Sequence, residues 1–173
     1  MAQSTPNPGS DDVITRIDRM VDAPDQVLLN SASTIAAELL GCGEAILERW
    51  LRAQEMVPTT HTVEGFRLLA LQRQGARGDP SFNACRETCR ELVYYHNLVR
   101  LDPANDDVPR RLRLGAMVAR HLALFIDGKL EVAGLGEFCC SSRPLRGASS
   151  SNAEAPRNQD LIHAHHPRLQ HSR

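Results

Sequence analysis

The sequence predicts an all-α protein with five or six helices between disordered ends. Its 173 residues match the size of one domain with tails. Apolar residues recur at helical spacing, first in residues 11–22, where Ser10 or Asp11 can cap the helix. The first ten residues are rich in Pro, Gly and Ser, and residues 141–173 show no apolar periodicity. Both ends are therefore expected to be disordered.

Two helical arms are expected next, at residues 25–40 and 44–56, on either side of Gly41-Cys42-Gly43. Each glycine inside a continuous helix costs roughly 0.5–1 kcal/mol relative to Ala. We therefore expect a tight corner at Gly41. The alternatives are one continuous helix that carries two costly glycines, or a plain helical hairpin whose glycines serve packing.

The remaining elements follow from turn residues and apolar runs. Residues 57–69 contain a Pro and several Thr, which favour a loop or small hairpin, and a short helix is expected over 68–74.

Another helix should run from Pro80 or Ser81 to about Leu101. A buried helix is expected over 108–126 because Pro109 suits a first helical turn. Asp127-Gly128 would either close that helix or form a hairpin turn, and we favour the helix.

The corner at Gly41 suits a helix-turn-helix. In this motif the first helix needs small residues where the second crosses it, which Ala36 and Ala37 supply, and Leu47 and Trp50 would face the core. The outer face of the second arm would then be free for the major groove of DNA. Its polar residues are Glu44, Glu48, Arg49 and Arg52.

Residues 34–69, TIAAELLGCGEAILERWLRAQEMVPTTHTVEGFRLL, resemble the winged-helix DNA-binding domain of the MerR family of transcription regulators. Shared features are the glycine corner, the aromatic Trp50, the Met-Val-Pro exit at 56–58 and the Gly-Phe-Arg at 65–67. The resemblance covers roughly a fifth of the chain. It implies a helical lead-in and winged helix-turn-helix over residues 11–80, followed by a helical pair over 81–140 that serves as a homodimer contact or effector pocket.

The resemblance implies a small bacterial DNA-binding regulator. Arg67 in the wing would contact a phosphate, and Arg49 and Arg52 would lie close to the backbone or groove. Glu44 and Glu48 would discriminate bases, because a carboxylate accepts a hydrogen bond from cytosine.

The charge pattern keeps a second function open. The formal net charge is −1, and Glu44 and Glu48 would repel the phosphates that supply most of the affinity for DNA. The alternative is a non-enzymatic helical accessory or adaptor protein that binds another protein.

The sequence shows no phosphate-binding Gly-rich loop, nucleophile elbow or His-Glu-x-x-His, so we expect no enzyme and no cofactor. It has no secretory signal and no long apolar run, so a cytoplasmic protein without membrane contact is expected.

Cysteines raise a third possibility, a thiol or metal sensor. Cys85, Cys89 and His96 lie on one stripe of the helix expected after residue 80. His96 would stand about 10 Å further along the axis, too far to share an ion with the two thiols. The competing interpretation is that both cysteines are small core residues. Cys139-Cys140 and the His-Ala-His-His at 163–166 offer at most incidental or loose ligands, and no metal site is expected.

Overall fold

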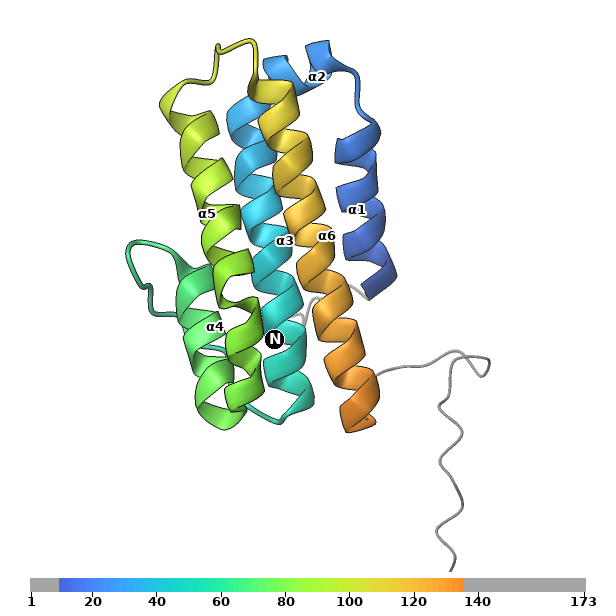
Figure 1. Ribbon diagram of the computed structural model, residues 1–173, viewed down its shortest axis with the longest axis vertical. Coiled ribbons are helices and arrows are strands. Elements are labelled where there is room, and N and C mark those ends of the chain that lie inside the picture. Colours follow the sequence, from blue (N-terminus) through green and yellow to red (C-terminus); the bar gives the residue numbers. More distant parts are fainter. Residues whose placement is uncertain (1–9, 136–173) are drawn as a thin grey trace, which may run out of the picture. The chain divides into compact units, whose positions relative to one another are not determined.

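Between residues 10 and 135, the part of the chain that the structure describes, this computed structural model consists of helices and short connections (Figure 1). The all-α prediction is confirmed for this range, which contains no β-strand and one isolated bridge, between Val63 and Phe66. The elements are α1 (Ser10–Asp22), α2 (Asp25–Asn30), α3 (Ala32–Ala53), α4 (Arg67–Gly78), the 3₁₀-helix η1 (Pro80–Cys85), α5 (Arg86–Leu101) and α6 (Val108–Ala133).

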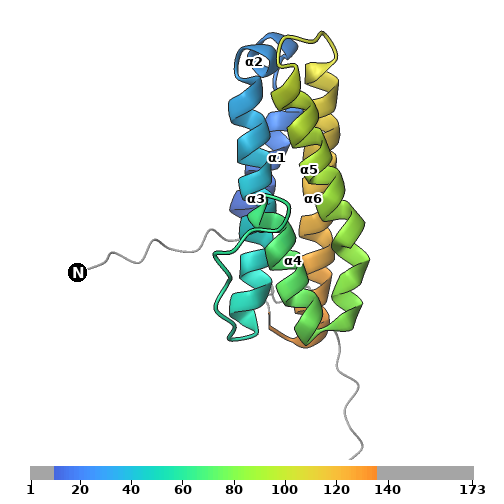
Figure 2. The same ribbon diagram turned by 90° about the vertical axis from the view of Figure 1, so that its left-hand side faces the viewer.

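Four long helices form a bundle around a central pair. Helices α3 and α6 run in the same direction and pack against each other, and α1 and α5 run opposite to them on the two sides of this pair (Figures 1 and 2). The shorter α4 packs against α3 and α5 near the end of the bundle where α3 terminates. This arrangement covers α3 with neighbours on several sides and leaves one face of α5 and α6 outside.

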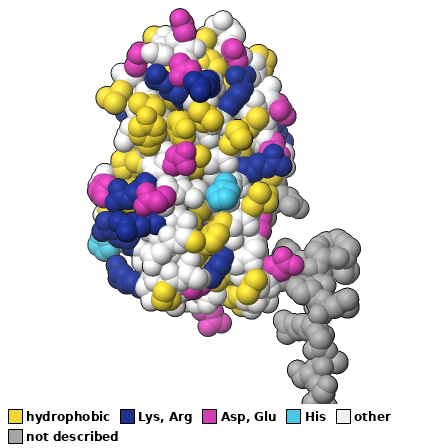
Figure 3. All heavy atoms as spheres, in the orientation of Figure 1, with side chains coloured by type: hydrophobic (Ala, Val, Ile, Leu, Met, Phe, Trp, Pro, Cys, Tyr) yellow, Lys and Arg dark blue, Asp and Glu magenta, His cyan; other side chains and the backbone are white. Residues whose placement is uncertain are grey.

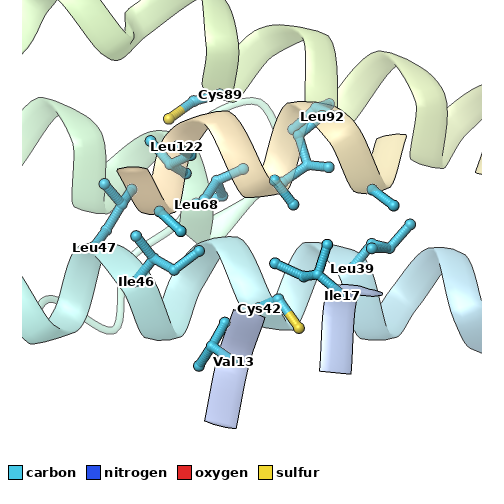
Figure 4. Packing of buried hydrophobic residues seen from close by; sticks show 14 of the residues in the cluster. Val13, Ile17, Leu39, Cys42, Ile46, Leu47, Leu68, Cys89, Leu92 and Leu122 are labelled. Atoms are coloured by element: carbon cyan, nitrogen blue, oxygen red, sulfur yellow. The ribbon is translucent and has the colours of Figure 1, made fainter. Parts of the chain in front are cut away.

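The core is built from the apolar stripe of each helix. Figure 4 shows Cys42 of α3 directed towards Val13 and Ile17 of α1, with Leu122 of α6 and Leu92 of α5 on the other side of α3. All five side chains are buried. Apolar burial of this kind stabilises a domain by about 25 cal/mol per Å², so packing of these stripes holds the helices together.

The corner expected at Gly41 is wrong, because α3 is a single helix from Ala32 to Ala53. The turn on which the helix-turn-helix prediction depended is therefore not present. Gly43 instead allows close packing: a Cβ built on it would lie 2.7 Å from Leu92 Cδ2 and 3.0 Å from Leu68 Cδ1. Gly41 is exposed, and a Cβ there would meet nothing within 4 Å. The alternative of one continuous helix is the correct one.

The small hairpin expected within residues 57–69 is present as a tight turn. Backbone bonds of 3.0 and 2.9 Å join Val63 and Phe66, and Glu64 and Gly65 between them have φ of 55° and 84°. Helix α4 begins at Arg67 and continues past the expected glycine stop to Gly78. Gly75 lies within it because the Phe82 ring packs there, with Cε1 2.6 Å from the position of a Cβ.

The helix expected from Pro80 or Ser81 to Leu101 is confirmed, with its first six residues in the tighter 3₁₀ form of η1. A helix from residue 108 is confirmed as well, but it is not buried on all sides, since Met117 and Leu124 are exposed. Asp127-Gly128 neither closes it nor forms a hairpin. Helix α6 runs on to Ala133 and ends at Gly134, whose φ of 68° suits a glycine.

Apart from Ser10 in α1, the ends expected to be disordered lie outside the described residues. No helix within residues 10–135 is both long and apolar enough to cross a membrane.

Candidate functional site

Four of the five residues predicted to bind DNA lie together. Glu44, Glu48 and Arg52 are spaced four residues apart on α3, so they share one helix face, and Arg67 at the start of α4 reaches them. Arg67 Nη1 lies 3.4 Å from Glu44 Oε2 and also contacts Glu48 Oε1. Glu48 in turn pairs with Arg52. We call these four residues the Arg67 cluster.

The Arg67 cluster ties the connection between α3 and α4 to α3. Arg67 Nε donates a 2.9 Å hydrogen bond to the backbone oxygen of Thr59 in that connection. Gln74 of α4 adds two bonds, because its Oε1 accepts from Thr59 N at 2.9 Å and its Nε2 donates to Val57 O at 2.8 Å. The two arginines and two carboxylates of the cluster sum to zero charge. Arg67 therefore holds the α3–α4 connection against α3. A phosphate that approached Arg67 would have to compete with the carboxylates of Glu44 and Glu48.

Arg49, the fifth predicted residue, lies on a different face of α3. It pairs with Asp127 of α6, and both side chains are largely covered. This ion pair joins the two central helices. The structure therefore does not bring Arg49 together with the Arg67 cluster.

A second polar cluster, which the sequence did not reveal, joins the far end of α6 to the start of η1. Lys129 Nζ bonds Asp79 and donates to Ser81 Oγ at 2.6 Å, and it stands 5.3 Å from the centroid of the Trp50 ring. Asp79 caps η1 by accepting from Ser81 N at 3.0 Å. The Lys129 ammonium and the Ser81 groups hold the pKa of Asp79 below its usual range. Trp50 stacks on Phe82 with centroids 5.6 Å apart.

The two cysteines of the predicted stripe are core residues. Cys85 and Cys89 are buried, and Cys85 Sγ donates to Phe82 O at 3.1 Å. The hydrogen bond with the Cys85 thiol, together with burial, raises the pKa of Cys89, and the same bond lowers the pKa of Cys85. Burial keeps both thiols away from external ligands and reagents. His96 packs edge-on against Phe66.

Among the described residues no three or more Cys, His, Asp or Glu side chains gather in a way that could hold a metal ion. Cys139-Cys140 and the residues at 163–166 lie outside that range.

A cavity between α3, α5 and α6 lies in the region where an effector pocket was expected, residues 81–140. Leu39, Tyr95, Arg111 and Gly115 are among the residues that line it. It has room for about one water molecule. An organic effector would not fit without movement of the helices.

Large apolar side chains are exposed on both α5 and α6. Tyr94, Leu101, Met117 and Leu124 are between 56% and 82% exposed, and we call these four residues the α5–α6 face. The two helices approach closely where Tyr95 Cβ would lie 3.4 Å from a Cβ on Gly115. Figure 3 shows hydrophobic side chains gathered over these helices. Large apolar patches on a surface often mark interaction sites.

Sequence reasoning missed this face because it assigned residues 81–140 only a general dimer or effector role. A signal was present in the spacing, since Tyr94 and Leu101, and likewise Met117 and Leu124, are seven residues apart and share one side of their helix. Comparisons of the chain with protein-family models, with curated proteins and with solved structures find no match.

Proposed function

We propose that this chain is a non-enzymatic helical accessory protein that acts by binding protein through the α5–α6 face. The observation that carries the proposal is the exposure of Tyr94, Leu101, Met117 and Leu124 on two helices that pack side by side. Tyr and Met are enriched at protein interfaces. Burying such side chains on binding releases water from apolar surface, which favours association.

Duplex DNA is the weaker candidate. Arg67 and Arg52 form ion pairs with Glu48, and Arg49 pairs with Asp127. Most of the affinity for DNA comes from cations that neutralise phosphates. Each of these arginines would have to give up a carboxylate to do so.

A crosslinking experiment tests the proposal. A photo-crosslinking amino acid replaces Leu124 in one sample and Val57, an exposed residue of the α3–α4 connection, in another. Irradiation in the producing cells followed by mass spectrometry should give a defined protein adduct from position 124 and none from position 57. Equal labelling from both positions, or none from 124, would contradict binding through this face.

A salt series on mixed DNA fragments separates this proposal from DNA binding. The purified chain should show no salt-sensitive retention. Retention at low salt that Arg67→Ala weakens would instead favour the DNA-binding regulator, because loss of a phosphate contact weakens binding across all sequences.

A further inference from the structure

Helix α6 carries an exposed seam with coiled-coil spacing. Its residues succeed one another in steps of four and three: Arg110, Leu114, Met117, His121, Leu124, Gly128 and Glu131. Leu114 is half-buried and the others are exposed. A repeat of 3.5 residues keeps one side of a helix turned towards a second long helix. Leu114, Met117 and Leu124 are the apolar members of the seam, and they lie in its middle, where a second helix could pack against them.

We propose that the partner on this seam is α6 of a second copy of the chain, packed antiparallel about a two-fold axis between the levels of Met117 and His121. This inference rests on the proposed function, since it names the protein that the α6 part of the α5–α6 face binds. In such a pair the same surface is used by both copies. Across the axis, Met117 of one copy then lies near Leu124 of the other, and Leu124 lies near Met117.

The charges of the seam favour an antiparallel copy. Arg110 lies in the first turn of α6 with its side chain 76% exposed, and Glu131 lies in the exposed last turn. Arg110 has a 3.6 Å contact with Asp107, long enough for a second carboxylate to compete. A parallel copy would place Arg110 beside Arg110 and Glu131 beside Glu131, whereas an antiparallel copy places Arg110 near Glu131 at both ends. Complementary charges across an interface fix the orientation of the partners, because like charges placed together are unfavourable.

Two arginines next to the seam have partners within the chain. Arg113 bonds Asp25, and Arg120 lies 3.2 Å from Asp18, so both arginines beside the seam are directed towards α1 and α2. Gly128 adds room for close approach, because a Cβ on it would meet nothing within 4 Å. The space over Gly128 would accept the stem of a long side chain such as Arg110 from the other copy.

Sedimentation equilibrium of the purified full chain tests the pairing, over roughly 1 to 200 μM protein. One helix seam is a small interface, so we expect a dimer with a dissociation constant on the order of tens of micromolar. Leu124→Glu should weaken association by at least about thirtyfold, since it would put a charge against Met117 of the other copy. Val57→Glu, a matched control outside the seam, should leave association unchanged. All these sites are exposed, and circular dichroism checks that the helices remain.

A charge exchange tests the orientation. Arg110→Glu and Glu131→Arg should each weaken the dimer by about five- to tenfold, and the double variant should return to within about twofold of the wild type. A wild-type chain that stays monomeric throughout overturns the inference, and so does a double variant no tighter than the singles. If the wild type is monomeric but position 124 still crosslinks a defined protein, only this inference fails. If position 124 crosslinks nothing either, the proposed function fails with it.

Discussion

Gly43 of α3 lies directly against Leu92 of α5, so that a Cβ on Gly43 would stand 2.7 Å from Leu92 Cδ2. A Cβ there would also lie 3.0 Å from Leu68 Cδ1, so both leucines would have to shift. We expect Gly43→Ala to lower the free energy of unfolding by up to about 1 kcal/mol, because overpacking of roughly 1–3 kcal/mol outweighs the roughly 0.5–1 kcal/mol gained in helix propensity. Urea denaturation followed by circular dichroism measures this change.

Gly41 provides the opposite case in the same helix. It is exposed, and a Cβ there would meet no atom within 4 Å. Gly41→Ala should therefore raise the free energy of unfolding by roughly 0.5–1 kcal/mol, since Ala has the higher helix propensity. A loss of stability on Gly41→Ala would mean that the chain turns at this position after all.

These two glycines show what the sequence could and could not establish. Helical spacing of apolar residues was enough to predict α1, α5 and α6, because burial in a bundle depends on that spacing. The role of a glycine depends on what lies across from it, and the approach of Leu92 to Gly43 is a contact between residues 49 positions apart. Local propensity treats Gly41 and Gly43 alike, so it indicated a corner.

The sequence was enough to predict which residues of the candidate DNA site share a helix face. It was not enough to predict that they form ion pairs with one another. The spacing of Glu44, Glu48 and Arg52 on one helix face follows from the sequence alone. That Arg67 would fold back on these carboxylates depends on the path of the α3–α4 connection, which no local pattern specifies. The α5–α6 face required knowledge of which helix sides the bundle leaves open.

Asp79 should make stability depend on pH in the acid range. Lys129 and Ser81 hold the pKa of Asp79 below its usual value, which is about 3.9 in an unfolded chain. A carboxyl with a lowered pKa stabilises the fold above that unfolded value, and this contribution is lost as the pH falls through the lower, folded value. Asp79→Asn should therefore cost roughly 0.5–1 kcal/mol at about pH 7 and little at about pH 2.

Chemical denaturation at several pH values measures the Asp79 effect. Lys129→Met is the matched background, because Asp79→Asn should matter less once the ammonium is gone. An undiminished effect of Asp79→Asn in that background would show that capping of η1, and not the ion pair, is responsible.

Thiol labelling tests the core assignment of the cysteines. Cys42, Cys85 and Cys89 are buried, and burial raises the pKa of the Cys42 thiol. In a variant with Cys139→Ser and Cys140→Ser, we expect these three thiols to react with an aromatic disulfide reagent only at the rate at which the fold opens. Labelling should become rapid in denaturant, and rapid labelling of the native chain would favour a thiol sensor.

Arg67→Ala should loosen the connection between α3 and α4. The substitution removes the 2.9 Å bond to Thr59 O and the contacts with Glu44 and Glu48, which leaves two carboxylates close together without their shared cation. We expect a loss of about 1–2 kcal/mol, because hydrogen bonds to charged groups are among the stronger ones. Hydrogen exchange should rise in residues 57–66 and stay unchanged in α1.

The control for Arg67 is Arg73→Ala, on the same helix. Arg73 is about half exposed and lies 3.8 Å from Glu64, a contact that contributes little in water. Arg73→Ala should leave both stability and exchange close to the wild type. If Arg67→Ala proves equally silent in stability and exchange, then Arg67 does not clamp the connection. Its guanidinium would in that case be available to an external anion, and this result would favour DNA binding through Arg67.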